Sequence, residues 1–130
     1  MDRHMSVTDL RSGPLAPSEC RRVGEVLSRI GDKWTVMIIA ELGEGPMRFN
    51  ELRRAIQGVS QRMLTLTLKN LERDGLVSRT VTPSVPPRVD YALTDLGRSM
   101  LEPVQALGQW AAAHIPQMDD ARRRYDALDR

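Results

Sequence analysis

The side chains best suited to chemistry in this sequence lie on one segment, Gln61–Arg73, which has helical periodicity. At 100° per residue, Leu64, Leu68 and Leu71 fall on one side of that helix and predict its buried face. The other side has cations for phosphates, polar groups for base edges and a leucine for thymine methyls. We therefore predict that a base-reading face comprises Gln61, Arg62, Thr65, Leu66 and Lys69.

The residues before this segment predict a helix-turn-helix. Asn50 is a good N-cap for a short helix over Glu51–Gln57. The turn at residues 58–60 contains glycine, and it ends at Ser60, which suits the N-cap of the next helix. Two helices joined by a short turn with glycine are typical of this motif.

After Gly75 the periodicity changes from helical to alternating. Two strands are predicted over Val77–Thr82 and Arg88–Leu93, joined by a proline-rich loop that cannot pair. Such a hairpin, or wing, can present cations to the phosphate backbone or the minor groove. The predicted phosphate or wing contacts are Arg53, Ser60, Arg79, Ser84 and Arg88.

The remaining segments complete a single fold. Helices are predicted over residues 21–30 and 32–42, the latter buried, and a short strand over residues 47–49. Thr94 is predicted to cap a long last helix that Pro103 bends or breaks. The fold class is mainly α with a small β-wing (α+β), a winged helix-turn-helix of order α-α-β-α-α-β-β-α. We assign residues 1–18 to a flexible N-terminal arm, 19–115 to the DNA-binding and dimerisation domain, and 116–130 to a C-terminal tail.

Composition excludes several functional classes. The longest apolar run, Val36–Ala40, is far shorter than the ~20 residues of a membrane helix, and no signal peptide precedes it, so we expect a cytoplasmic protein. One cysteine and two distant histidines predict neither a metal site nor a cofactor. Without a paired acid, base or nucleophile, we expect no enzyme. Residues 45–90 contain eight basic and four acidic residues, which favours an anionic partner.

The order of short motifs along the chain resembles the HxlR family, bacterial transcription regulators with a MarR-like winged helix. The motifs lie at residues 31–35 (GDKWT), 45–52 (GPMRFNEL), 71–77 (LERDGLV) and 85–89 (VPPRV). The match runs from Cys20 to about Trp110. The resemblance implies a homodimer on a pseudo-palindromic, double-stranded DNA operator, with the first and last helices in the interface.

The apolar residues of those two helices are the candidates for that interface. In the last helix they could also form ordinary core or the wall of an effector pocket, but we favour the dimer seam. The candidates are Val23, Leu27, Met100, Val104, Leu107, Trp110 and Ala111.

Cys20 is a candidate redox sensor. If Ser18 is the N-cap of the first helix, the helix dipole and the adjacent Arg21 and Arg22 favour the reactive thiolate. The resemblance implies the same role, because family members often have a cysteine here, although many follow it with proline where this chain has Arg21. The alternative is an inert cysteine packed against the first helix. The sequence allows two kinds of regulatory signal, an oxidant or a small-molecule effector.

Two functions from different classes fit these patterns. The first is a dimeric, sequence-specific DNA-binding transcriptional regulator. The alternative is a winged-helix protein-interaction module that binds an acidic partner. The basic middle of the chain and the face containing Arg62, Thr65 and Lys69 favour DNA.

Overall fold

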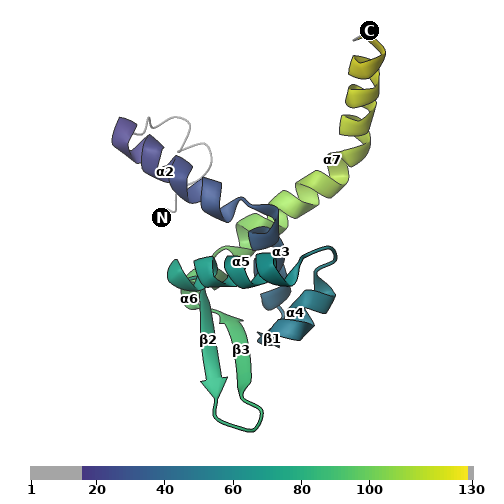
Figure 1. The fold of residues 1–130 in the computed structure, drawn as a ribbon. Helices are drawn as coiled ribbons and strands as arrows, with labels where there is room; N and C mark the ends of the chain where they lie inside the picture. Colours follow the sequence, from purple (N-terminus) through teal and green to yellow (C-terminus); the bar gives the residue numbers. More distant parts are fainter. Residues whose placement is uncertain (1–15, 129–130) are drawn as a thin grey trace. The chain divides into compact units, whose positions relative to one another are not determined.

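The computed structural model describes residues 16–128 and confirms the fold class (Figure 1). The chain divides into two units, residues 1–33 and 34–130, and we describe each by itself. The first fifteen residues of the predicted arm lie outside the described residues. Pro17 and Ser18, which the prediction placed in the arm, are helical.

Helix α2 (Pro17–Ile30) is the described element of the first unit. The condition that Ser18 is its N-cap is not met: Ala16 is the N-cap, and Pro17 occupies the first helical position, where proline is favoured because no N–H is needed. A carboxylate oxygen of Glu19 accepts the N–H of Ala16 at 3.0 Å, which satisfies one backbone donor at this end. Gly31 ends the helix, as predicted.

The second unit packs three helices around its core: α3 (Lys33–Leu42), α4 (Phe49–Ala55) and α5 (Gln61–Arg73). Helix α3 is less completely buried than predicted, because Met37 is exposed while Thr35, Ile38, Ile39 and Leu42 are buried. The buried hydrophobic residues are Ile38, Ile39, Leu42, Leu52, Ile56, Val59, Leu64, Leu68, Leu71, Leu76, Val77, Leu93 and Val104.

A three-stranded antiparallel sheet of order β1-β3-β2 lies beside these helices. It consists of β1 (Met47–Arg48), β2 (Val77–Thr82) and β3 (Arg88–Leu93), and the two longer strands have the predicted bounds. In the register, Val77 pairs with Leu93 and Thr82 with Arg88. The hairpin β2–β3 forms the wing, which projects from the helices (Figure 1).

Helix α4 begins before its predicted N-terminus. Arg48 is the N-cap and Asn50 lies within the helix, so the prediction that Asn50 caps it was wrong. A carboxylate oxygen of Glu51 accepts the Arg48 N–H at 2.8 Å and so performs the capping that we assigned to Asn50. The strand β1 therefore passes directly into α4.

The long last helix is in fact two helices. Thr94 caps the four-residue α6 (Asp95–Arg98), and α7 (Leu101–Leu128) begins after a break at residues 99–100. Pro103 does not cause this break, because it occupies the first turn of α7, where its missing N–H would have no helical acceptor. Helix α7 continues through Pro116, so the predicted tail is helical as far as Leu128.

A very close contact fixes α6 against the start of the wing. A Cβ added to Gly97 would lie 2.0 Å from the carbonyl oxygen of Leu76, a distance that no side chain tolerates. Thr94 holds the same junction: its hydroxyl donates to the Gly75 carbonyl at 2.6 Å and accepts the Gly97 N–H at 3.0 Å. Position 97 therefore requires glycine.

We expect Gly97→Ala to lower the free energy of unfolding by about 3 kcal/mol, because the new methyl group must displace backbone. Thermal and urea unfolding measure the loss. Gly108→Ala is the matched control: nothing lies within 4 Å of its added Cβ, so a gain of up to about 1 kcal/mol in helix propensity is expected. Equal stability of the two variants would contradict the close packing.

Candidate nucleic-acid interface

The turn between α4 and α5 sets the entry of the second helix. Gly58 has a φ of +86°, a left-handed conformation that glycine adopts without strain. Ser60 is the N-cap of α5, and its side-chain oxygen accepts the Met63 N–H at 3.0 Å. Both features, and the bounds of α5, agree with the prediction.

The inner face of α5 is buried in the core. Leu64, Leu68 and Leu71 are buried, and so is Thr67. The hydroxyl of Thr67 donates to the Met63 carbonyl at 2.8 Å, so this polar group is satisfied within the helix. Burial of this stripe fixes the rotation of the helix about its axis.

The outer face of α5 presents the five predicted base-reading residues together. All five are exposed, including Leu66, half of whose surface remains accessible. They line a single shallow hollow of about 590 Å³, which contains two cations and no carboxylate. Donors, a hydroxyl and an apolar group therefore lie on one surface, which is the combination that base edges require. The lining residues are Gln61, Arg62, Thr65, Leu66 and Lys69.

The two arginines of the wing lie on opposite faces of the hairpin. Arg79 pairs with Tyr91 across the strands, whereas Arg88 pairs with Thr82, and these two pairs alternate in side. The guanidinium of Arg88 lies 3.1 Å from a carboxylate oxygen of Asp90, two residues along the same strand. A single straight duplex segment therefore cannot receive both arginines from the same side.

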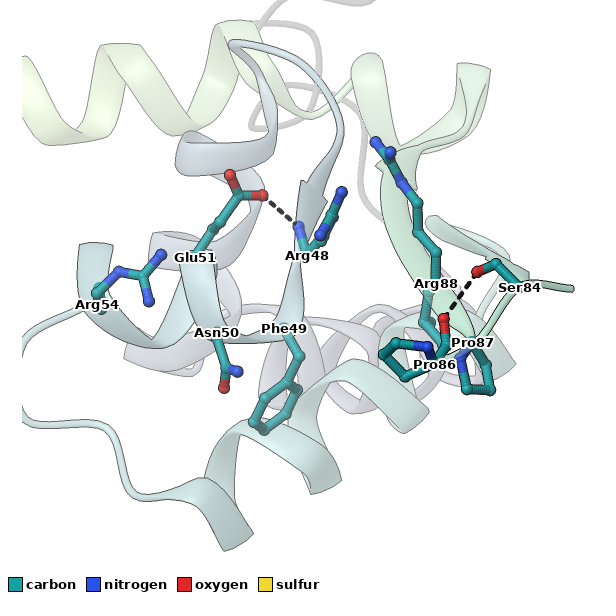
Figure 2. Close-up of a pocket in the computed structure, with 10 residues that line it drawn as sticks. Arg48, Phe49, Asn50, Glu51, Arg54, Ser84, Pro86, Pro87 and Arg88 are labelled. Carbon is teal, nitrogen blue, oxygen red and sulfur yellow. Dashed lines mark hydrogen bonds between the residues drawn. The ribbon is translucent and has the colours of Figure 1, made fainter. Parts of the chain in front are cut away.

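A second hollow, of about 730 Å³, lies between α4 and the tip of the wing. Figure 2 shows Arg54 on its α4 side, Arg88 on its wing side and Arg48 between them. Glu51, the acidic residue in the lining, is used to cap α4. The hollow is therefore a cationic surface with space for an anionic group.

Sequence reasoning missed Arg48 and Arg54 and assigned Arg53 instead. Arg53 is exposed but does not line this hollow. Arg48 lies opposite Asp90 of β3, a pairing that a two-residue strand does not reveal in the sequence. The helical position of Arg54 was the available signal, because it lies one turn after Asn50, which also lines the hollow.

The two predicted hydroxyl contacts differ in what they already do within the chain. The Ser60 oxygen accepts the capping hydrogen bond of α5, which does not use its O–H, whereas the Ser84 hydroxyl donates to the Pro86 carbonyl at 2.7 Å, as Figure 2 shows. Ser84 therefore shapes the loop at the tip of the wing. Its predicted contact with phosphate would first require this hydrogen bond to break.

The predicted dimer residues differ in exposure. Val104 is buried in the chain's own core, so little of its side chain is available to a second copy. Met100 and Ala111 are half-buried, whereas Leu107 and Trp110 are 61% and 52% exposed. On α2, Val23 and Leu27 are exposed.

Cys20 is exposed on α2, and its N–H donates to the Ala16 carbonyl at 2.9 Å. It is the fourth residue of α2, further from the helix N-terminus than a cap at Ser18 would place it. The predicted influence of the helix dipole on its thiol is therefore weaker, because the dipole acts mainly within the first turn.

Residues 16–128 contain no group of three or more metal-ligating side chains placed to hold an ion. None of their helices is long and apolar enough to cross a membrane.

These elements define a winged helix-turn-helix protein, with α4 and α5 as the motif and β2–β3 as the wing. The HxlR-like helix-turn-helix family matches residues 29–119, and the chain belongs to this family. The family consists of transcriptional regulators and not of enzymes.

Known proteins with a similar sequence or structure agree with this membership. The uncharacterized HTH-type transcriptional regulator YtfH of Escherichia coli (strain K12) is 42% identical over 109 residues, which cover 84% of this chain and 86% of that protein. The structure of the redox regulator HypR in its reduced form has a TM-score of 0.71 and 38% identity, covering 76% of this chain and 98% of that one. A structure described as a MarR-family regulator from Porphyromonas gingivalis W83 has a TM-score of 0.69 and 35% identity, covering 77% and 97%.

We expect Arg88→Ala to weaken binding to DNA of any sequence and to reduce the slope of log affinity against log salt by about 0.9, the value for one lost phosphate contact. Arg79→Ala, on the other face of the wing, should have a smaller effect. Fluorescence anisotropy at several salt concentrations measures both variants. A larger loss for Arg79→Ala than for Arg88→Ala would reverse this assignment of the two faces.

Proposed function

We propose that the protein binds a pseudo-palindromic operator in double-stranded DNA as a homodimer, in the cytoplasm, and regulates transcription from it. The observation that carries this proposal is the outer face of α5. Five side chains suited to base edges and phosphates lie there on one exposed hollow of a helix whose inner face is buried. A helix held in this way can enter the major groove without rearrangement.

Arg62 and Lys69 have different roles in this proposal. Arg62 is the second residue of α5, in the region where recognition helices contact base edges. Its planar guanidinium matches the two acceptors of guanine. Lys69 lies about two turns further along and binds phosphate as a point charge.

The hollow between α4 and the wing supplies the backbone contact. Arg48, Arg54 and Arg88 surround a space large enough for a phosphate, and its one carboxylate is engaged at the start of α4. Contacts to phosphates fix the register of a protein on a duplex, while base contacts provide the sequence preference.

A dimer is needed because one short helix reads few base pairs. A two-fold axis doubles the reading surface and places two half-sites about one helical turn apart. Exposed apolar side chains on α2 and α7 support such an interface. On α2 these include Val23 and Leu27, and on α7 Leu107 and Trp110.

An oxidant acting on Cys20 is the proposed signal. The thiol is exposed, and the similar structure of HypR is that of a redox regulator. Because the sequence has one cysteine, a disulfide would join two copies of the chain. Each thiol would lose a proton, and a two-electron oxidant would accept the two electrons released as the S–S bond forms. No feature of the described residues favours a small molecule over an oxidant as the signal.

We expect Arg62→Ala to cost about 1–3 kcal/mol on the operator and to relax its sequence preference. Lys69→Ala should weaken operator and random DNA equally and reduce the salt dependence. Gel shifts on the DNA next to the gene, with random DNA as competitor, measure both effects. Arg62→Lys is the matched control, because it keeps the charge and loses the bidentate geometry.

An equal loss on operator and random DNA for Arg62→Ala would contradict the base-reading role. Binding to the operator that random DNA abolishes, together with capture of an acidic protein, would instead support the alternative of a protein-interaction module.

We expect an oxidant such as diamide to change operator affinity in the native protein and not in Cys20→Ser. Serine keeps the approximate size of the side chain, so circular dichroism and the melting temperature should stay unchanged. Non-reducing electrophoresis should show the disulfide-linked pair for the native chain. The same oxidant response in both proteins would exclude Cys20 from the mechanism.

A further inference from the structure

Leu66 is an apolar side chain at the centre of the polar outer face of α5. Around the helix axis it lies about 40° from Arg62 and about 160° from Leu64, which is in the core. No small rotation of the helix could therefore bury it with the inner stripe. A single exposed leucine is common on protein surfaces, so its neighbours have to identify its partner.

The other side chains of the hollow on α5 select bases by their hydrogen-bonding groups. Arg62 and Lys69 can only donate, Gln61 and Thr65 can donate or accept, and no carboxylate is among the lining residues. In the major groove, guanine presents two acceptors, and thymine presents one acceptor and the C5-methyl group. Cytosine presents a donor, which a carboxylate would accept. The hollow therefore suits guanine and thymine better than cytosine.

The position of Leu66 along the helix sets the distance between the two contacted bases. Leu66 lies four residues after Arg62 on the same side of α5, and four residues advance an α-helix by about 6 Å. Successive nucleotides of one strand are about 3.4 Å apart along the duplex. For a recognition helix in the major groove, the two side chains therefore reach bases about two base pairs apart.

We propose that each half-site of the operator contains a guanine that binds Arg62 and, about two base pairs away, a thymine whose C5-methyl group packs on Leu66. This inference rests on the proposed function and specifies part of the DNA sequence that the protein recognises. Deoxyuridine lacks the methyl group of thymidine and keeps its Watson–Crick pairing. The contact can therefore be removed from the DNA without changing the base pairs.

The test combines a change in the protein with a change in the DNA. The DNA next to the gene is prepared with deoxyuridine in place of thymidine. We expect this to weaken binding of the native protein about fourfold for each half-site, the factor for one buried carbon group of this size. Leu66→Ala should lose the same factor on thymidine DNA and lose nothing further on deoxyuridine DNA. Fluorescence anisotropy measures the four dissociation constants.

Met63→Ala is the matched control, because it shortens another exposed apolar side chain of α5 that does not line the hollow. It should keep the native sensitivity to loss of the methyl groups. Alanine favours helix, so circular dichroism should show both variants folded. If Met63→Ala loses the sensitivity while Leu66→Ala responds as the native protein does, the assignment to Leu66 is overturned.

The outcomes separate this inference from the proposed function. If the native protein does not prefer the thymidine form of this DNA to random DNA, the proposed function fails. If it does prefer that DNA, but the native protein and Leu66→Ala lose the same factor on deoxyuridine DNA, the regulator stands and the methyl contact fails.

5-Methylcytosine presents a methyl group at the same place in the major groove. The same DNA is therefore also prepared with 5-methylcytosine in place of cytosine. Tighter binding to it that requires Leu66, together with no effect of deoxyuridine, would assign the methyl group to a methylated cytosine and overturn the choice of thymine.

Single substitutions in the DNA test the spacing. Deoxyuridine replaces one thymidine at a time, and 7-deazaguanine, which lacks the N7 acceptor, replaces one guanine at a time. We expect one guanine whose replacement weakens the native protein but not Arg62→Ala. About two base pairs from it, we expect a thymine whose replacement weakens the native protein but not Leu66→Ala. A sensitive thymine more than about four base pairs from that guanine would overturn the proposal, because one helical turn cannot span that distance.

Discussion

Burial of the leucine stripe on α5 is the constraint on which the interface depends. Each fully buried leucine contributes about 1.5–3 kcal/mol relative to exposure. A rotation of α5 that exposed Leu64, Leu68 and Leu71 would therefore remove a large part of the free energy of unfolding of the domain. The rotation of α5 is therefore set by the core. The side chains of Arg62 and Lys69 point to solvent because the leucines point inward.

Features with local causes could be predicted from the sequence. The bounds of α5 follow from a capping serine at one end and Asp74-Gly75 at the other, and both act within one helical turn. The strands of the wing follow from their alternating pattern and from the prolines of the loop that joins them, which cannot take part in the ladder. The exposed face of α5 was predictable for the same reason, since it is the complement of a regular apolar stripe.

Features that depend on distant parts of the chain were not predictable. Thr94 caps α6 as its type suggests, but the close approach of Gly97 to Leu76 joins residues twenty-one positions apart, and nothing in the local sequence indicates it. Val104 continues an apolar stripe that looks uniform in the sequence, yet only the fold decides that it is core and that Leu107 is exposed. The place of Arg48 in the hollow between α4 and the wing could not be predicted, because it depends on the pairing of β1 with β3.

The ion pair on the wing has a consequence for how the wing meets DNA. The Asp90 carboxylate holds the Arg88 guanidinium as a phosphate would, at 3.1 Å, so the side chain is oriented before any duplex arrives. An exposed pair of this kind is worth only about 0–1 kcal/mol, so Asp90 gives up the guanidinium to a phosphate at little cost. When that phosphate is released, the same carboxylate can receive the guanidinium again, so Arg88 has a partner both on and off the duplex.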